Sequence, residues 1–159
     1  MFYNSYMANT IAYMVTWTTY GTWLQGDVRR YVKDGVTLLP DNDLAESNRQ
    51  ALEKEPVRFD KKHRQIVEDA IRQKAEQFGQ QIHAIAVCSN HVHLLVSYIA
   101  KPIEFVVQHY KAAGLMALRE SGIQGKVWTK GFDKRYCFDQ ATLQKKIEYV
   151  NRHFLPKNI

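Results

Sequence analysis

The chain has 159 residues, of which 45% are hydrophobic and 24% are charged, an ordinary composition for a folded protein in water. No apolar run is long enough to cross a bilayer, which argues against a membrane protein. The formal net charge of +6 favours a polyanionic partner, because lysine and arginine neutralise phosphates.

The organisation of the chain predicts a single domain over residues 1–159, with its own hydrophobic core. It contains no internal repeat, low-complexity tract or linker that would mark a second domain. The first residues lack a basic leader ahead of an apolar stretch, so we expect a cytoplasmic protein.

The N-terminal half alternates between regular and irregular patterns. Residues 11–18 are rich in β-branched and aromatic types and predict a first strand. Residues 28–46 mix charge, glycine and proline without a period, which predicts a long loop. Residues 58–78 place apolar side chains at helical spacing, and Gly79 supplies a stop.

The C-terminal half predicts a hairpin, two helices and one more strand. Two apolar runs at 81–89 and 91–98, separated by turn formers, predict the hairpin. Helices are expected at 103–120 and at 140–154, the latter after an Asp N-cap. A third strand region covers 126–138.

This order of elements is that of an α+β, ferredoxin-like fold, in which helices cover one face of an antiparallel sheet. The last helix is an addition to that arrangement. We therefore expect the second face of the sheet to stay uncovered and available for a functional site.

Two histidines open the second strand of the predicted hairpin. His91 and His93 flank Val92, and because side chains alternate along a strand, both imidazoles point to the uncovered face. Neutral imidazole is a common ligand of divalent metals, and two of them leave positions for a third ligand, water and a substrate oxygen. For the bare motif, two ordinary hydrogen-bonded histidines are the alternative.

The last predicted helix carries a candidate nucleophile. Tyr149 and His153 are four residues apart, so both project from one helical face. A phenol there can attack a phosphate, and the imidazole can complete a metal site. Tyrosine has an ordinary pKa of about 10, so it needs a base or metal nearby to assist removal of its proton.

These motifs resemble those of a known family. SNHVHLLV resembles the His-hydrophobic-His (HUH) signature of the single-domain tyrosine transposases of the IS200/IS605 type and their REP-associated relatives. VWTKGFDKRYCFD followed by LQKKIEYVNRH resembles the segment that bears their catalytic tyrosine, and TTYGTWLQGD resembles a stretch found in a subgroup. The similarity runs through nearly the whole chain.

The resemblance implies a metal-dependent endonuclease and strand transferase for single-stranded or hairpin DNA, acting through a 5′-phosphotyrosine. It makes Tyr149 the nucleophile and His91 and His93 the metal pair. His153 falls where many members have Gln or Asn as the third ligand, and an imidazole there favours Mn²⁺ relative to Mg²⁺. Relatives act as monomers or homodimers, and the sequence leaves this choice open.

Other residues are candidates for DNA contacts. Asn90 precedes the histidine pair and either touches DNA or forms the hairpin turn, and its local role is the stronger interpretation. Basic and aromatic side chains elsewhere suit phosphate binding and base stacking, although Trp128 is equally suited to a core. This second group comprises Lys111, Arg119, Trp128, Lys130, Lys134 and Arg135.

Two other functions remain open beside the transposase. One is a domesticated, non-mobile relative that binds or nicks palindromic repeats. The other is a basic nucleic-acid-binding module whose histidines hold no metal. Formation of a covalent adduct with DNA would distinguish the enzyme functions from the binding module.

Overall fold

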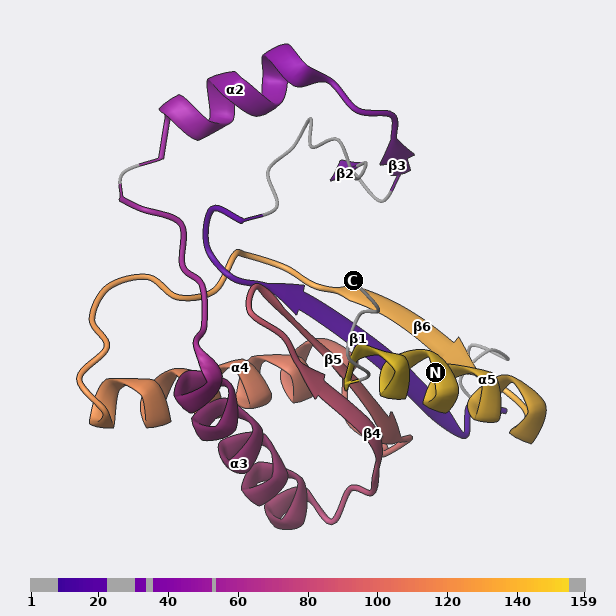
Figure 1. Ribbon diagram of the computed structural model, residues 1–159. Helices are drawn as coiled ribbons and strands as arrows, with labels where there is room; N and C mark the ends of the chain where they lie inside the picture. Colours follow the sequence, from indigo (N-terminus) through magenta and orange to yellow (C-terminus); the bar gives the residue numbers. More distant parts are fainter. Residues whose placement is uncertain (1–8, 23–30, 34–35, 53, 155–159) are drawn as a thin grey trace.

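The computed structural model describes residues 9–22, 31–33, 36–52 and 54–154. Its centre is a four-stranded antiparallel sheet in the order β4-β5-β1-β6 (Figure 1). The strands are β1 (Ala12–Thr18), β4 (Ile82–Val87), β5 (His91–Ser97) and β6 (Asp133–Cys137). This is the strand order of a ferredoxin-like β-α-β-β-α-β unit, so the predicted fold class is confirmed.

Two helices cover one face of the sheet, α3 (Lys61–Phe78) and α4 (Ile103–Glu120). Asp60 caps α3 by accepting a hydrogen bond from the backbone N–H of His63, and Gly79 ends it at a φ of 64°. The large core lies between these helices and the strand side chains that point toward them. It includes Tyr13, Val15, Trp17, Val92, Leu94, Val67, Ile71 and Tyr110.

The second face, expected to be uncovered, is partly covered by α5 (Gln140–Asn151). Leu143, Ile147 and Val150 form an apolar stripe at helical spacing on α5, and burial of this stripe requires a partner surface. The sheet offers small side chains there, including Ala12, Ala84 and Ala86. A 3₁₀ turn, η1 (Arg152–Phe154), continues α5.

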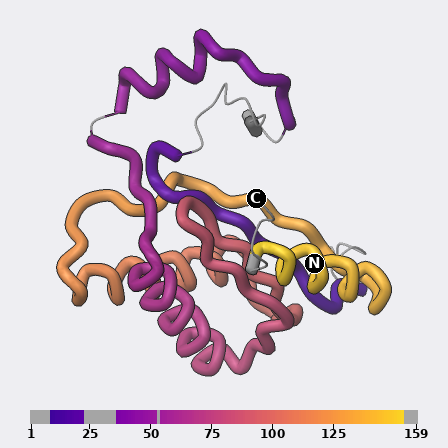
Figure 2. Tube along the Cα trace, viewed as in Figure 1, coloured from indigo at the N-terminus to yellow at the C-terminus, as the bar shows by residue number. Residues whose placement is uncertain are grey.

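The predicted loop over 28–46 contains regular structure within its described part. Strands β2 (Tyr31–Lys33) and β3 (Val36–Leu38) pair with each other, and helix α2 (Asn42–Gln50) follows. The helix was missed because it is short and mostly polar, although Asp41 caps it by accepting from the N–H of Leu44. Figure 1 shows these elements lying apart from the four-stranded sheet, and Figure 2 shows the same for β3 and α2.

The third predicted strand, 126–138, is shorter than expected, since β6 spans only Asp133–Cys137. Gly131 has a φ of 89°, which interrupts the extended conformation ahead of β6. The residues before it still pair with the end of β1, where the N–H of Thr129 donates to the carbonyl of Thr18 at 3.0 Å. Within the described ranges, no helix has the length and apolarity needed to cross a membrane.

Candidate active site

Three histidines meet on the α5 side of the sheet. His91 and His93 come from β5, and His153 comes from η1 at the end of α5. One ring nitrogen of each lies within 4.8 Å of the others. The ring centroids of His93 and His153 are 4.5 Å apart, and those of His91 and His93 are 4.6 Å apart. Strand alternation sets the first two rings on one face, and the docking of α5 delivers the third.

Each imidazole has its Nδ1 in a hydrogen bond. Nδ1 of His93 is 2.7 Å from the hydroxyl of Thr16, its cross-strand neighbour on β1. Nδ1 of His91 is 2.8 Å from Oδ1 of Asn90, and Nδ1 of His153 donates to the carbonyl of Tyr149 at 3.0 Å. Such bonds fix the orientation of a ligand ring, so a metal ion here would be bound through Nε2.

The electrostatics of the cluster favour an uncharged His93 ring. His93 is only 7% exposed, and burial lowers its pKa to about 3, with smaller contributions from His91 and His153. His93 is therefore neutral near pH 7, the protonation state in which imidazole is a ligand. Three converging nitrogen donors on an accessible surface fit a divalent transition-metal ion with open positions for substrate oxygens.

Tyr149 lies beside this cluster on α5. The centroid of its ring is 5.4 Å from that of His93 and 5.1 Å from that of His153. Its exposed fraction is 41%, so the phenol is open to solvent and to a substrate. The guanidinium of Arg152 lies over the same ring, with its Cζ 5.9 Å from the ring centroid. The arrangement puts an accessible phenol, a group that can act as a nucleophile, next to a candidate metal site.

A cleft of about 910 Å³ opens beside the cluster. Tyr149, Arg152 and His153 line it from α5 and η1, and the turn before His91 contributes Asn90. The start of α3 adds Lys61 and Arg64, two basic residues that the sequence interpretation missed. Their only signal in the sequence is a spacing of three residues on one helix face, which solvated surface charges commonly share.

Of the predicted DNA contacts, Trp128 lies in the core on the α4 side, and Lys111 is half-buried beside it. Trp128 is 8% exposed, and its indole N–H donates to the carbonyl of Lys111 at 2.9 Å. The ammonium of Lys111 donates to the carbonyls of Thr129 and Gly131, at 2.8 and 3.1 Å. Burial, with a smaller effect of Lys126, lowers the pKa of Lys111. Both side chains thus hold the 128–131 segment against α4.

The other predicted contacts are dispersed. Arg119 donates to the carbonyl of Ile123 at 3.2 Å, and Lys134 forms an ion pair with Glu104 at 3.3 Å. Arg135 pairs with Asp133 at 3.2 Å on the same sheet face as the histidines, and Lys130 is exposed. Of the residues predicted to contact DNA, Asn90 alone lines the cleft.

Comparison with known proteins places the chain in a family. A family model described as transposase, IS200-like, matches residues 52–153, well over half of the chain. Strand β1, at the centre of the sheet, precedes that matched range. No curated protein matches.

Two solved structures are similar to this chain. A REP-associated tyrosine transposase bound to a REP hairpin superposes with a TM-score of 0.56 at 12% identity, covering 99% of this chain and 76% of that one. A candidate transposase of Deinococcus radiodurans R1 has a TM-score of 0.49 at 15% identity, covering 98% and 100%. At 12% identity the first of these structures shows the fold alone. The family match over residues 52–153 shows that this chain belongs to the IS200-like transposases.

Proposed function

We propose that this chain is a metal-dependent endonuclease and strand transferase for single-stranded or hairpin DNA, with Tyr149 as its nucleophile. One observation carries the proposal: three histidine nitrogens within 4.8 Å of one another, with the exposed Tyr149 ring 5.4 Å from His93. The family match supports transposase chemistry, and the REP-associated structural neighbour is bound to hairpin DNA.

His91, His93 and His153 would hold Mg²⁺ or Mn²⁺, and a set of three imidazoles favours Mn²⁺ of the two. When bound, such an ion polarises a phosphate oxygen and orients the scissile bond. The chain itself sets the orientation of the rings through Thr16, Asn90 and the carbonyl of Tyr149.

In the cleavage step, the Tyr149 oxygen attacks the phosphorus of a backbone phosphodiester. The new oxygen–phosphorus bond forms as the bond from phosphorus to the 3′ oxygen breaks, leaving a 5′-phosphotyrosine. The phenol gives up one proton and the departing 3′ oxygen takes up one, so the product is a free 3′ hydroxyl and no water is consumed. Attack by a 3′ hydroxyl on the phosphotyrosine reverses these bond changes and joins strands.

The first test is to map the covalent product. Wild-type protein incubated with hairpin oligonucleotides and Mn²⁺ should give an adduct that survives denaturing gel electrophoresis. Mass spectrometry of its proteolytic peptides should place the nucleotide on Tyr149. We expect a chelator to abolish the adduct, because the three imidazoles then have no ion to hold, and Mn²⁺ to restore it. Binding of the hairpins without any adduct would favour a nucleic-acid-binding module instead.

Thr16→Val is expected to weaken Mn²⁺ binding by roughly 10 to 100-fold, the usual effect of losing a hydrogen bond to a ligand ring. Valine keeps the shape of threonine but removes the hydroxyl that lies 2.7 Å from Nδ1 of His93. Titration of the DNA-free protein with Mn²⁺, followed by electron paramagnetic resonance, measures this affinity directly.

Two variants serve as controls for this measurement. Thr16→Ser restores a hydroxyl and should recover most of the affinity. Thr18→Val makes the same change opposite His91, whose Nδ1 bonds to Asn90 instead, and should leave the affinity unchanged. Equal losses in Thr16→Val and Thr18→Val would mean that the hydroxyl of Thr16 does not orient His93.

A further inference from the structure

The cleft beside the histidines has a basic wall that the proposed bond exchange does not use. Lys61, Arg64, Gln65 and Glu68 line the cleft from α3. Their spacing of three, four and seven residues from Lys61 places them on one face of the helix. The wall is thus one face of a single helix, and it carries two cationic side chains, one amide and one carboxylate.

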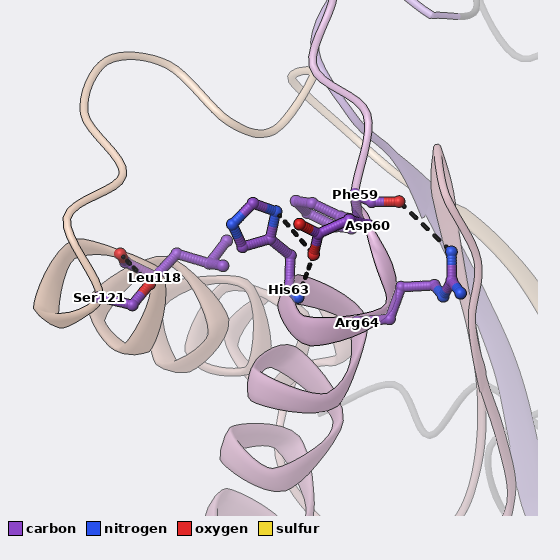
Figure 3. A network of polar contacts seen from close by, with 6 residues as sticks. All are labelled: Phe59, Asp60, His63, Arg64, Leu118 and Ser121. Carbon is purple, nitrogen blue, oxygen red and sulfur yellow. Dashed lines mark hydrogen bonds and ion pairs between the residues drawn. The ribbon is translucent and has the colours of Figure 1, made fainter.

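Backbone contacts fix this wall next to the active site. The N–H of Phe59 donates to the carbonyl of Ser89 at 2.7 Å, which ties the start of α3 to the turn before His91. The guanidinium of Arg64 donates to the carbonyl of Phe59 at 3.4 Å, and Figure 3 shows it extending from α3 past Phe59 toward the strands. Arg64 is therefore held on the side of α3 that faces the hairpin.

The charges around the cleft favour an anion. Lys61 and Arg64 contribute two positive charges from α3, and Arg152 contributes a third beside Tyr149. The acidic lining residue Glu68 forms an ion pair with Arg72 at 3.3 Å, which offsets its charge. The excess of positive charge lies within the same cleft as the proposed nucleophile, where a DNA phosphate must arrive.

We propose that this cleft binds the single-stranded DNA that leads to the scissile phosphate, with Lys61 and Arg64 contacting its backbone phosphates. The inference rests on the proposed function, because it takes the cleft as the approach to Tyr149. A cleft volume of about 910 Å³ is enough to accommodate one or two nucleotides of a strand that continues beyond it. The lysine and the arginine would contact the phosphates of this strand, because cationic side chains that track a backbone pair with phosphate oxygens.

The test compares binding of two fluorescent probes, a DNA hairpin with a single-stranded tail of mixed sequence and the same hairpin with a blunt end. Binding is followed by fluorescence anisotropy over a range of salt concentrations, all in the Tyr149→Phe background so that no covalent step contributes. Each phosphate contact to a single strand adds about 0.7 to the slope of log affinity against log salt. Lys61→Ala with Arg64→Gln should therefore reduce the slope for the tailed probe by about 1.4.

The same double variant should weaken binding of the tailed hairpin by about tenfold or more at low salt, and leave the blunt hairpin unchanged. Lys62→Ala with Lys74→Gln is the matched control, since it also removes two positive charges from α3, at positions that do not line the cleft. A second comparison, of the salt slopes of Lys61→Ala and Lys62→Ala, leaves the half-buried Arg64 unchanged. Thermal unfolding checks that all variants are folded.

Equal changes in the cleft and control variants, equal changes on both probes, or no binding of the tailed probe by the parent protein would each overturn the inference. The experiments distinguish a failure of this inference from a failure of the proposed chemistry. If the wild type forms no adduct but the slope falls only in the cleft variants, the cleft still binds a strand and the nuclease function is wrong. If the adduct forms and the slopes do not separate, the chemistry stands and the strand follows another path.

Discussion

Tyr149→Phe is expected to reduce the rate of covalent adduct formation by roughly 10⁴ to 10⁶-fold, the scale on which removal of a nucleophile acts. Phenylalanine retains the ring that lies 5.4 Å from His93 and 5.1 Å from His153, and the surface over which Arg152 lies. Only the phenolic oxygen is removed. Affinity for hairpin DNA should therefore stay within about twofold of the wild type.

Single-turnover kinetics with labelled hairpin DNA and Mn²⁺ measure the rate of adduct formation, and fluorescence anisotropy measures the affinity. Tyr136→Phe is the matched control, because Tyr136 packs against the core on the other face of the sheet, with its ring 6.4 Å from that of Tyr13. It should form the adduct at the wild-type rate. Adduct formation by Tyr149→Phe at more than a trace would assign the nucleophile to another side chain.

Trp128→Ala is expected to lower the free energy of unfolding by about 3 to 5 kcal/mol. The indole makes edge contacts with Trp17 and Phe59, at centroid distances of 5.9 and 5.4 Å. Truncation leaves a cavity among these rings, and it also removes the donor to the carbonyl of Lys111. With a side chain only 8% exposed, Trp128 is expected to act in the core and not in stacking on bases.

Urea denaturation followed by circular dichroism measures this loss. Trp128→Phe should lose clearly less than Trp128→Ala because it keeps an aromatic ring at the site. Met116→Ala on α4, whose side chain is largely exposed, should change stability by less than about 0.5 kcal/mol. A stable Trp128→Ala protein with weakened affinity for single-stranded DNA would restore the stacking role that the sequence suggested.

The parts of the site that follow from local periodicity could be predicted from the sequence. Strand alternation alone places His91 and His93 on one face, and helical spacing alone places Tyr149 and His153 on one side of α5. The convergence of the two pairs depends on how α5 packs. Its apolar stripe docks on the small alanines of the sheet, and this covers a face that the sequence left open.

The parts that depend on contacts between distant segments could not be predicted. Lys61 and Arg64 enter the cleft because Phe59 bonds to the backbone of Ser89 in the hairpin turn, and a side-chain pattern does not encode that contact. Thr16 reaches His93 through strand pairing whose register appears only in the assembled sheet. Conversely, the aromatic and basic residues near Trp128 looked like a DNA surface because composition does not distinguish a buried ring from a stacking platform.

His153 and Tyr149 share one short helical segment, and the ring of the first is hydrogen-bonded to the backbone of the second. Occupancy of the proposed metal site and docking of that segment would therefore be thermodynamically linked. An ion that binds all three imidazoles stabilises the docked helix by an amount that grows with the logarithm of its concentration. Conversely, local undocking would withdraw the proposed third ligand and the proposed nucleophile together. The proposed site would thus form as one cooperative unit. Docking of the helix would favour ion binding, and a bound ion would favour the docked helix.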